Sequence, residues 1–389
     1  MTTPSDPLRG LRPQIMVRHW QTGRKADTAA ACASLAHDSS AQPEELFAAV
    51  EAVLQHDMVP AYDAALVCAQ RILAQTPNAG VYRAIAHFQW VSGRTADAIA
   101  ALRTAIQLEP GQSRAWYRLG LMELEDGNPF DAVRSSSVAL GLEPPAPGAR
   151  LVREIALRLL TNRPVVDVAF AGTTLRFRLS GKTFTVDSSH ITGHINEEAE
   201  LLALTALPGP WRCIVDIGGN VGNHAVVFHR LLRPARLVVY EVNPRCLPIL
   251  SANLALNQTP GSEYEVRPRA IGAAKGRLFL PYHDDLNTGL EETGTGPGET
   301  VEVVPLDDEV AAADLIKIDV EGMELEVLRG AARIIRESAP WLLIEVQEGN
   351  HTAFEEWMQS QDYCVARSFE HSGYRNLLAG PKARVLALG

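Results

Sequence analysis

The sequence predicts two parts of different fold class, an all-helical part followed by an α/β part built on a largely parallel sheet. Residues 44–160 are rich in alanine and leucine, and their apolar residues recur at helical spacing with few β-branched runs. From residue 165 onward, short Val/Ile runs alternate with glycines and with shorter helical patterns. We expect the last helix of the first part to stop near Asn162-Arg163-Pro164, because proline disfavours helical geometry in the residue before it.

The helical part contains an internal repeat. Pro77, Pro110 and Pro144 are 33 and 34 residues apart. Segments 82–86 and 116–120 align with each other, and so do segments 98–105 and 132–139. A period of this length is typical of helix–turn–helix units that stack on their neighbours.

These segments resemble the tetratricopeptide (TPR) family. Glu123 stands where the repeat pattern has an aromatic residue, and Ser136 stands where it has a bulky one, so we interpret this unit as degenerate. An earlier unit runs from about Gln42 to Pro77, and Ala149–Leu160 is expected to form a capping helix. Three units are about the minimum that buries a continuous core. Such arrays usually bind a partner, so contact with a protein partner or self-association is expected of this part.

The expected domains are therefore an N-terminal irregular or helical segment (1–43), TPR-like repeats with a capping helix (44–162) and an α/β domain (163–389). With 389 residues, of which 46% are hydrophobic, the chain is long enough for about two domains. Its 36 basic and 46 acidic side chains give a net charge of −10. A surface built to neutralise phosphates is disfavoured, so neither nucleic acid nor a membrane is expected as a partner.

Five scattered cysteines form no C-x-x-C pair, which indicates reduced thiols in an intracellular compartment. No apolar run reaches the length of a bilayer span, and the first residues lack the apolar core of a signal peptide. A soluble cytoplasmic protein is therefore expected.

In the α/β part, a glycine loop follows a predicted strand. Residues 213–217 predict a short buried strand, residues 218–222 (GGNVG) a turn, and residues 225–228 the start of an apolar helix. Glycines let the backbone turn sharply and let a ligand lie against the main chain. A second predicted strand, Leu237–Tyr240, is followed by Glu241. A carboxylate at that position is the usual way that a Rossmann-like crevice holds a ribose diol.

Two cofactors compete for this pattern, a dinucleotide and S-adenosylmethionine (AdoMet). The loop has the form D-x-G-x-N-x-G, and it lacks the third glycine that packs a helix close to a pyrophosphate. AdoMet has no pyrophosphate, and Asp216 could serve its ammonium group. The loop alone leaves a dehydrogenase as an alternative.

Three sequence blocks together resemble the FkbM family of AdoMet-dependent methyltransferases. They are residues 215–222 (VDIGGNVG), 240–244 (YEVNP) and 314–324 (DLIKIDVEGME), with residues 327–330 (VLRG) following. The resemblance covers about residue 165 to the C-terminus. One departure is Gly219, where the family more often has alanine, and we expect this difference to be tolerated.

The resemblance implies a class I methyltransferase fold, with a seven-stranded, mostly parallel sheet flanked by helices and AdoMet at the C-terminal ends of the first strands. By position, the glycine loop would wrap the methionine part of AdoMet, Glu241 would hold its ribose, and residues 269–271 would face its adenine. The residues implied to bind the cofactor are Asp216, Gly218, Gly219, Asn220, Gly222, Asn223, His224, Glu241, Asn243, Ala270, Ile271 and Asp319.

Strand patterns agree with this fold. Leu315–Ile318 and Leu342–Val346 are short apolar runs suited to strands that are buried on both faces. Between them, Glu324–Ile335 predicts an amphipathic helix. Cys364–Phe369 and Arg384–Leu388 predict the strands that close the sheet.

The resemblance also implies methylation of a hydroxyl oxygen, typically on a saccharide or natural product. An alcohol is a poor nucleophile at neutral pH, so the site must remove its proton during attack. Acids at strand ends line the crevice of open α/β sheets, which makes Asp319 the expected base and Glu321 and Glu345 further candidates. His283, in the loop after residues 277–280, is another candidate because a neutral imidazole is available at the working pH.

These acids have other interpretations. They could cap the following helix or pair with nearby basic residues. Asp319, Glu345 and His351 could instead bind a divalent cation that lowers the pKa of the acceptor hydroxyl, but oxygen ligands leave little spacing signature and no metal is assigned. Upstream, His190 and His194 have helical spacing with Glu197, yet no further well-spaced ligand supports zinc.

The sequence therefore predicts an AdoMet-dependent O-methyltransferase whose acceptor is a small-molecule or glycan hydroxyl. Its repeats would recruit or position that acceptor, or mediate assembly. The alternative is a non-catalytic TPR scaffold that carries a degenerate AdoMet-binding domain.

Overall fold

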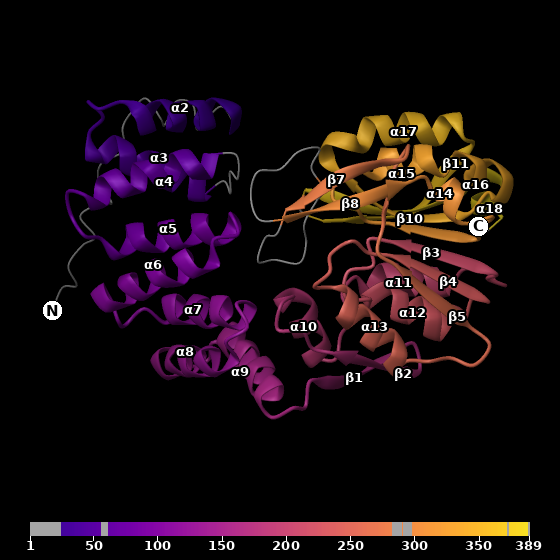
Figure 1. Ribbon diagram of the computed structural model, residues 1–389, viewed down its shortest axis with the longest axis horizontal. Coiled ribbons are helices and arrows are strands. Elements are labelled where there is room, and N and C mark those ends of the chain that lie inside the picture. The colour runs from indigo at the N-terminus through magenta and orange to yellow at the C-terminus, as the bar shows by residue number, and fades with distance from the viewer. Residues whose placement is uncertain (1–24, 56–60, 282–289, 291–297, 372, 388–389) are drawn as a thin grey trace. The chain divides into compact units, whose positions relative to one another are not determined.

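The computed structural model describes residues 25–55, 61–281, 290, 298–371 and 373–387 (Figure 1). The chain divides into two compact units, residues 1–160 and 161–389. Within the described residues, the first unit contains helices and no strands, and the second alternates strands with helices. No described helix combines the length and the apolar character needed to cross a bilayer.

In the first unit, successive helices pack against one another in chain order (Figure 1). These helices are α2 (Lys25–His37), α3 (Pro43–Gln55), α4 (Tyr62–Leu73), α5 (Ala79–Val91), α6 (Thr95–Leu108), α7 (Ser113–Glu125), α8 (Pro129–Leu142) and α9 (Pro147–Leu160). Helices α3 to α8 form three helix–turn–helix pairs, and α9 packs on α7 and α8. The TPR-like fold class is thus confirmed. Residues 1–24 of the N-terminal segment lie outside the described residues.

The degenerate repeat position is occupied by a satisfied buried acid. Glu123 is 1% exposed on α7, and its two carboxylate oxygens accept hydrogen bonds from Nη2 of Arg103 at 2.8 Å and Oγ of Ser135 at 2.7 Å. A buried carboxylate is tolerated when its oxygens are paired in this way. Polar pairing therefore replaces the apolar packing that an aromatic side chain would supply there.

The second unit contains a hairpin, a seven-stranded sheet and a three-stranded sheet. Its strands are β1 (Val165–Phe170), β2 (Thr173–Arg178), β3 (Cys213–Ile217), β4 (Arg236–Tyr240), β5 (Glu263–Arg267), β6 (Ala270–Ile271), β7 (Gly276–Pro281), β8 (Gly298–Val304), β9 (Leu315–Ile318), β10 (Trp341–Gln347), β11 (Tyr363–Glu370) and β12 (Tyr374–Pro381). Its helices and helical turns are α10 (Phe184–Ile191), α11 (Glu198–Thr205), α12 (Asn223–Val227), η2 (Phe228–Leu232), α13 (Leu247–Leu256), α14 (Leu306–Glu309), α15 (Glu324–Gly330), α16 (Ala332–Ser338), η3 (Glu348–Asn350), α17 (His351–Ser360) and α18 (Lys382–Leu386).

The large sheet has the order β11-β12-β10-β9-β3-β4-β5. Strands β10, β9, β3, β4 and β5 pair in parallel, whereas β12 is antiparallel to both β10 and β11. The expectation of a seven-stranded, mostly parallel sheet is confirmed. The carboxyl ends of the five parallel strands therefore share one edge, where ligands bind in open α/β sheets.

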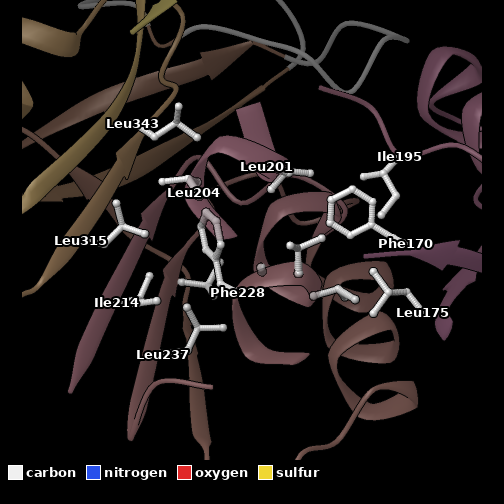
Figure 2. Close-up of a cluster of buried hydrophobic side chains, with 14 of the residues drawn as sticks. Phe170, Leu175, Ile195, Leu201, Leu204, Ile214, Phe228, Leu237, Leu315 and Leu343 are labelled. Carbon is white, nitrogen blue, oxygen red and sulfur yellow. The ribbon is translucent and has the colours of Figure 1, made fainter. Parts of the chain in front are cut away.

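Alternate strand residues pack into two cores, one on each face of the sheet. Ile214 and its neighbours on one face pack with α11, α12, α13 and the β1–β2 hairpin, and Val215 and its neighbours on the other face pack with α15, α16 and α17. Figure 2 shows the first core, with Phe228 between the sheet and the group that contains Phe170 and Leu175 of the hairpin. Burial on both faces explains the continuous apolar runs of these strands.

The prediction that residues 384–388 form the last strand is wrong. The closing strand is β12, and the chain then forms α18, while residues 388–389 lie outside the described residues. Leu378 of β12 is 1% exposed, whereas Leu386 of α18 is 70% exposed. The closing strand therefore comes from the buried apolar residues of β12 and not from Val385 and Leu386.

The single helix predicted for residues 324–335 is also wrong, because the chain forms α15 and α16 with a break at Ala331. At this break, Gly330 approaches the backbone of Gly272. A β-carbon on Gly330 would lie 2.0 Å from the carbonyl oxygen of Gly272. A tertiary backbone contact thus fixes the end of α15.

We expect Gly330→Ala to lower the free energy of unfolding by about 1–3 kcal/mol, because the added methyl group forces backbone atoms apart. Gly276→Ala is the matched control, since a β-carbon there meets nothing within 4 Å. It should change stability by less than about 1 kcal/mol. Urea unfolding of both variants measures the difference, and equal stability would contradict the contact at Gly330.

Candidate active site

The glycine loop after β3 is tied to two neighbouring strand ends. Gly218 has φ +80°, and a β-carbon there would lie 1.7 Å from the carbonyl oxygen of Asp319 at the end of β9. The backbone N–H groups of Gly218 and Gly219 donate to the carbonyl oxygen of Tyr240, at 2.9 and 3.0 Å. Only glycine fits at position 218, because both the positive φ and the close approach exclude a side chain.

Gly219, the departure from the resembled family, is also tightly enclosed. A β-carbon at Gly219 would lie 2.3 Å from Cγ1 of Val239 on β4. Valine is stiff at χ1, so it cannot easily turn aside. Val239 fills the space that the methyl group of an alanine at position 219 would need, so glycine is the residue that fits here.

A cavity of about 490 Å³ lies at the carboxyl ends of β3, β4, β9 and β10. Among the predicted site residues, those that line it are Gly218, Gly219, Asn220, Asn223, His224, Glu241, Asn243, Ala270, Ile271, Asp319, Glu321 and Glu345. Asp216 and Gly222 do not line the cavity. His283 lies outside the described residues.

Glu241 joins the glycine loop to the end of β4. Its carboxylate is 8% exposed and accepts backbone N–H bonds from Asn220 at 2.6 Å and from Asn243 at 2.7 Å. Burial raises the pKa of Glu241 above its usual range, and these N–H groups oppose that rise. The side chain is therefore held rigidly at the cavity wall, with lone pairs left for a ligand.

Lys317 and two aspartates form an ionic layer beneath the loop, in which Lys317 and Asp216 are buried and Asp319 is partly exposed. Nζ of Lys317 donates to the carbonyl oxygen of Gly218 at 2.7 Å, and it lies 3.1 Å from Oδ2 of Asp319 and 3.4 Å from Oδ1 of Asp216. Asp216 is fully buried, and Lys317 is 4% exposed. Burial alone would lower the pKa of Lys317, but the carboxylates of Asp319 and Asp216 raise it above its usual value. The ammonium is therefore a permanent charge of the site.

Three acids form a group at the cavity wall. Asp319, Glu321 and Glu345 each place one carboxylate oxygen within 4.8 Å of the others. Nε2 of Gln347 donates to Oε1 of Glu345 at 2.8 Å. Burial, followed by the charges of Asp319 and Glu321, raises the pKa of Glu345 to about 9. At neutral pH, Glu345 therefore holds a proton.

The ligands considered for a divalent cation, Asp319, Glu345 and His351, do not come together as one group in the structure. Nε2 of His351 lies 3.0 Å from the carbonyl oxygen of Val346, and Glu321 stands with Asp319 and Glu345 in the described acidic group. The three oxygens could hold a divalent cation, for which carboxylates are suitable ligands.

The histidine pattern upstream of the loop is divided by a helix end. His190 is 2% exposed, stacks on Phe177 and lies 3.1 Å from Oδ1 of Asn223 through Nε2. Helix α10 ends at Ile191, so His194 is not on the helix that carries His190. The two histidines therefore do not share one helix, and His190 supports Asn223 of the loop.

Three residues that line the cavity, Lys317, Glu197 and Tyr374, are not among the predicted site residues. In the sequence, Lys317 belongs only to the block 314–324, and Glu197 belongs only to the histidine pattern. Glu197 has φ +58°, and its Oε2 lies 3.1 Å from Nε2 of His224. Burial opposes its ionisation, but His224 and the other neighbours outweigh burial and hold the pKa of Glu197 near 2. Tyr374 reaches the cavity from β12, a strand that was misplaced in the prediction.

Comparison with known proteins identifies the domain that contains this cavity. Residues 216–375 match the Methyltransferase FkbM domain. The chain is 26% identical over 139 residues to the hexuronic acid methyltransferase AglP of Haloferax volcanii, a match that covers 34% of this chain and 55% of AglP. It is 26% identical over 193 residues to the methyltransferase sdnD of Sordaria araneosa, covering 40% of this chain and 74% of sdnD. The chain thus spans about half the length of AglP.

Among solved structures, that of MamA is similar over 39% of this chain and 88% of its own, with 18% identity and a TM-score of 0.35.

We expect Lys317→Met to lower the free energy of unfolding by about 3–5 kcal/mol, because it leaves the fully buried carboxylate of Asp216 without its cation. Adding Asp216→Asn should restore part of the stability. Lys275→Met removes an exposed surface pair with Asp308 and serves as the control, with a change of at most about 1 kcal/mol. Urea unfolding of the three variants and the parent chain measures these values.

Glu345 makes the stability of the chain depend on pH. Its pKa is raised from 4.5 to about 9 on folding, so the unfolded chain loses this proton at lower pH and stability falls as the pH rises between these values. We expect Glu345→Gln to raise the free energy of unfolding by about 1–3 kcal/mol at pH 8 and to have little effect near pH 4. Denaturation across pH tests this, with Glu356→Gln on α17 as an exposed control. A gain that does not depend on pH would argue against it.

Proposed function

We propose that this chain, whose residues 216–375 form an FkbM methyltransferase domain, transfers a methyl group from S-adenosylmethionine to a hydroxyl of a saccharide or natural product. One observation carries the proposal: the glycine loop, Glu241 and the acidic group line one cavity at the carboxyl edge of the parallel strands. The printed names of AglP and sdnD support the reaction class.

The residues at the cavity suit S-adenosylmethionine. Gly218 and Gly219 line the cavity, so a ligand can lie against their backbone. Glu241 retains acceptor capacity for ribose hydroxyls, and Ala270 and Ile271 offer an apolar surface for a purine ring. The acids of the wall suit a ligand that carries a sulfonium and an ammonium.

When bound, S-adenosylmethionine supplies an electrophilic methyl group on a positively charged sulfur. The chain must then orient the acceptor hydroxyl and take its proton. Oδ2 of Asp319 faces the Lys317 ammonium at 3.1 Å, which fixes the direction of the carboxylate. Oδ1 of Asp319 is the atom that we assign as proton acceptor.

The other candidate bases fit this role less well. Glu345 holds a proton at neutral pH because its pKa is about 9. In this form it can donate a hydrogen bond to the acceptor, but it cannot act as the base that takes the proton of the acceptor. Glu321 is exposed, with φ +52°. A solvated carboxylate is a weaker base than a partly buried one.

The helical repeats fit a role in recruiting the acceptor or in assembly, because repeat arrays present extended binding surfaces. The five cysteines are all free thiols. Free thiols suit a reducing compartment, and we propose the cytoplasm as the site of action.

Calorimetric titration of the full chain with S-adenosylmethionine tests the proposal first. We expect saturable binding and a higher melting temperature in the presence of the ligand. An absence of heat at high micromolar ligand would favour the non-catalytic scaffold, and binding of NAD(H) instead would favour a dehydrogenase.

Asp319→Asn tests the base. The variant should keep its affinity for S-adenosylmethionine and lose at least about 100-fold in turnover, measured as transfer of labelled methyl to a panel of sugars and glycosides. Glu356→Gln serves as the control for substitution of an acid away from the cavity. If turnover by Asp319→Asn is unchanged, the base is Glu321, Glu345 or His283.

A further inference from the structure

The ammonium group of S-adenosylmethionine needs an anionic acceptor that can be reached from the cavity. By sequence, Asp216 is the candidate for this group. In the structure, Asp216 is fully buried and does not line the cavity. Its Oδ1 faces Nζ of Lys317 at 3.4 Å. Asp216 therefore serves as the partner of the buried lysine, and the ammonium group requires another carboxylate.

Glu197, between α10 and α11, reaches the cavity wall beside the glycine loop. The carbonyl oxygen of Asn196 accepts a hydrogen bond from Nδ2 of Asn223 at 2.9 Å, which ties this segment to the first residue of α12. Glu197 lines the same cavity as Gly218 and Gly219. Its carboxylate therefore stands near the loop backbone, against which the methionine part of the cofactor would lie.

The backbone of Glu197 is held in a conformation that a side chain disfavours. Glu197 has φ +58° and ψ 42°, in the left-handed region, directly before α11. This region is left mostly to glycine and asparagine, because a β-carbon comes too close to the following carbonyl oxygen. The side chain of Glu197 makes no capping hydrogen bond to α11, so the helix start does not account for a glutamate here. Backbone strain of this kind is typical of functional sites.

The carboxylate of Glu197 is charged and fixed in direction. Burial raises its pKa, but His224, Lys317 and Asn376 outweigh burial and hold the pKa near 2. Oε1 accepts a hydrogen bond from Nδ2 of Asn376 at 3.0 Å. Oε2 lies 3.1 Å from Nε2 of His224 without hydrogen-bond geometry, since that buried nitrogen has no hydrogen-bond partner among the described residues. A carboxylate has about four lone-pair sites, so Glu197 keeps acceptor capacity for a ligand.

We infer that Glu197 holds the ammonium group of S-adenosylmethionine. The inference rests on the proposed methyltransferase function and assigns one residue of its cofactor site. Hydrogen bonds between an ammonium and a carboxylate are charge-assisted and strong, and the side chain of Glu197 is only 13% exposed to competing water. Glu345 lacks the charge, because it holds a proton at neutral pH. Asp319 already faces the ammonium of Lys317.

Two ligands that carry no methyl group to transfer isolate the ammonium: S-adenosylhomocysteine and its deamino analogue, in which a hydrogen atom replaces the amino group. Calorimetric titration of the full chain measures both dissociation constants. We expect the parent chain to bind S-adenosylhomocysteine at least about tenfold more tightly than the analogue, because the analogue leaves the carboxylate of Glu197 without its partner. Glu197→Gln keeps an amide oxygen for Asn376 but removes the charge, so this preference should fall to about threefold or less.

Two further variants complete the comparison. Glu197→Asn also removes the charge, and asparagine adopts the left-handed region more readily than other residues with a side chain, so the test stands where the glutamine variant does not fold. Glu198→Gln is the control, because it changes the neighbouring acid, whose side chain is 44% exposed and pairs with His194. This control should keep the preference of the parent chain.

An unchanged preference in the Glu197 variants would overturn the inference, and so would a parent chain that binds the two compounds equally well. Variants that weaken both compounds by the same factor would assign Glu197 a structural role and would overturn it too. All three results leave the proposed function intact. If the parent chain binds neither S-adenosylmethionine nor S-adenosylhomocysteine, the proposed function fails and the inference fails with it.

Discussion

The buried ammonium of Lys317 is the interaction on which the rest of the site depends. Lys317 on β9 lies directly opposite Asp216 in the parallel pairing of β9 with β3. Neither charge is acceptable alone in a sheet covered on both faces, because burial of an unpaired ion costs several kcal/mol. Lys317 pairs with Asp216 and Asp319 and donates to the carbonyl oxygen of Gly218, while the two buried carboxylate oxygens of Asp216 have no hydrogen-bond partner among the described residues. Removing Lys317 would therefore disturb the sheet and the loop at once.

This ionic layer explains why the ends of the adjacent strands β9, β3 and β4 are firmly connected. Lys317 draws the loop onto β9, where Gly218 permits backbone contact with Asp319. The same loop donates two N–H bonds to Tyr240 and one to Glu241 at the end of β4. Each contact needs the strand register to be correct, because a one-residue slip would turn every side chain to the other face. Rigid positioning of this kind is what a reacting pair of groups requires.

The sequence predicted those parts of the molecule whose signals are local. Strand runs, the glycine loop and the acids at strand ends all lie within short blocks, and most of the residues predicted there line the cavity. Glu197 and Tyr374 reach the same cavity from distant segments, and no local pattern announces such an approach. The end of α15 likewise depends on Gly272, which lies 58 residues before Gly330 in the chain. These features depend on tertiary contacts, which neither residue propensity nor hydrophobic periodicity reveals.

The enclosed position of Gly219 also has an evolutionary consequence. A methyl group at this residue and the Cγ1 atom of Val239 would occupy the same space, so the two positions cannot change independently. A lineage that gains alanine in the loop must first shorten the residue on β4, and a lineage that already has alanine there must lose its methyl group before it acquires the valine. The substitutions are thus epistatic, and aligned relatives should show a correlated exchange at these two positions.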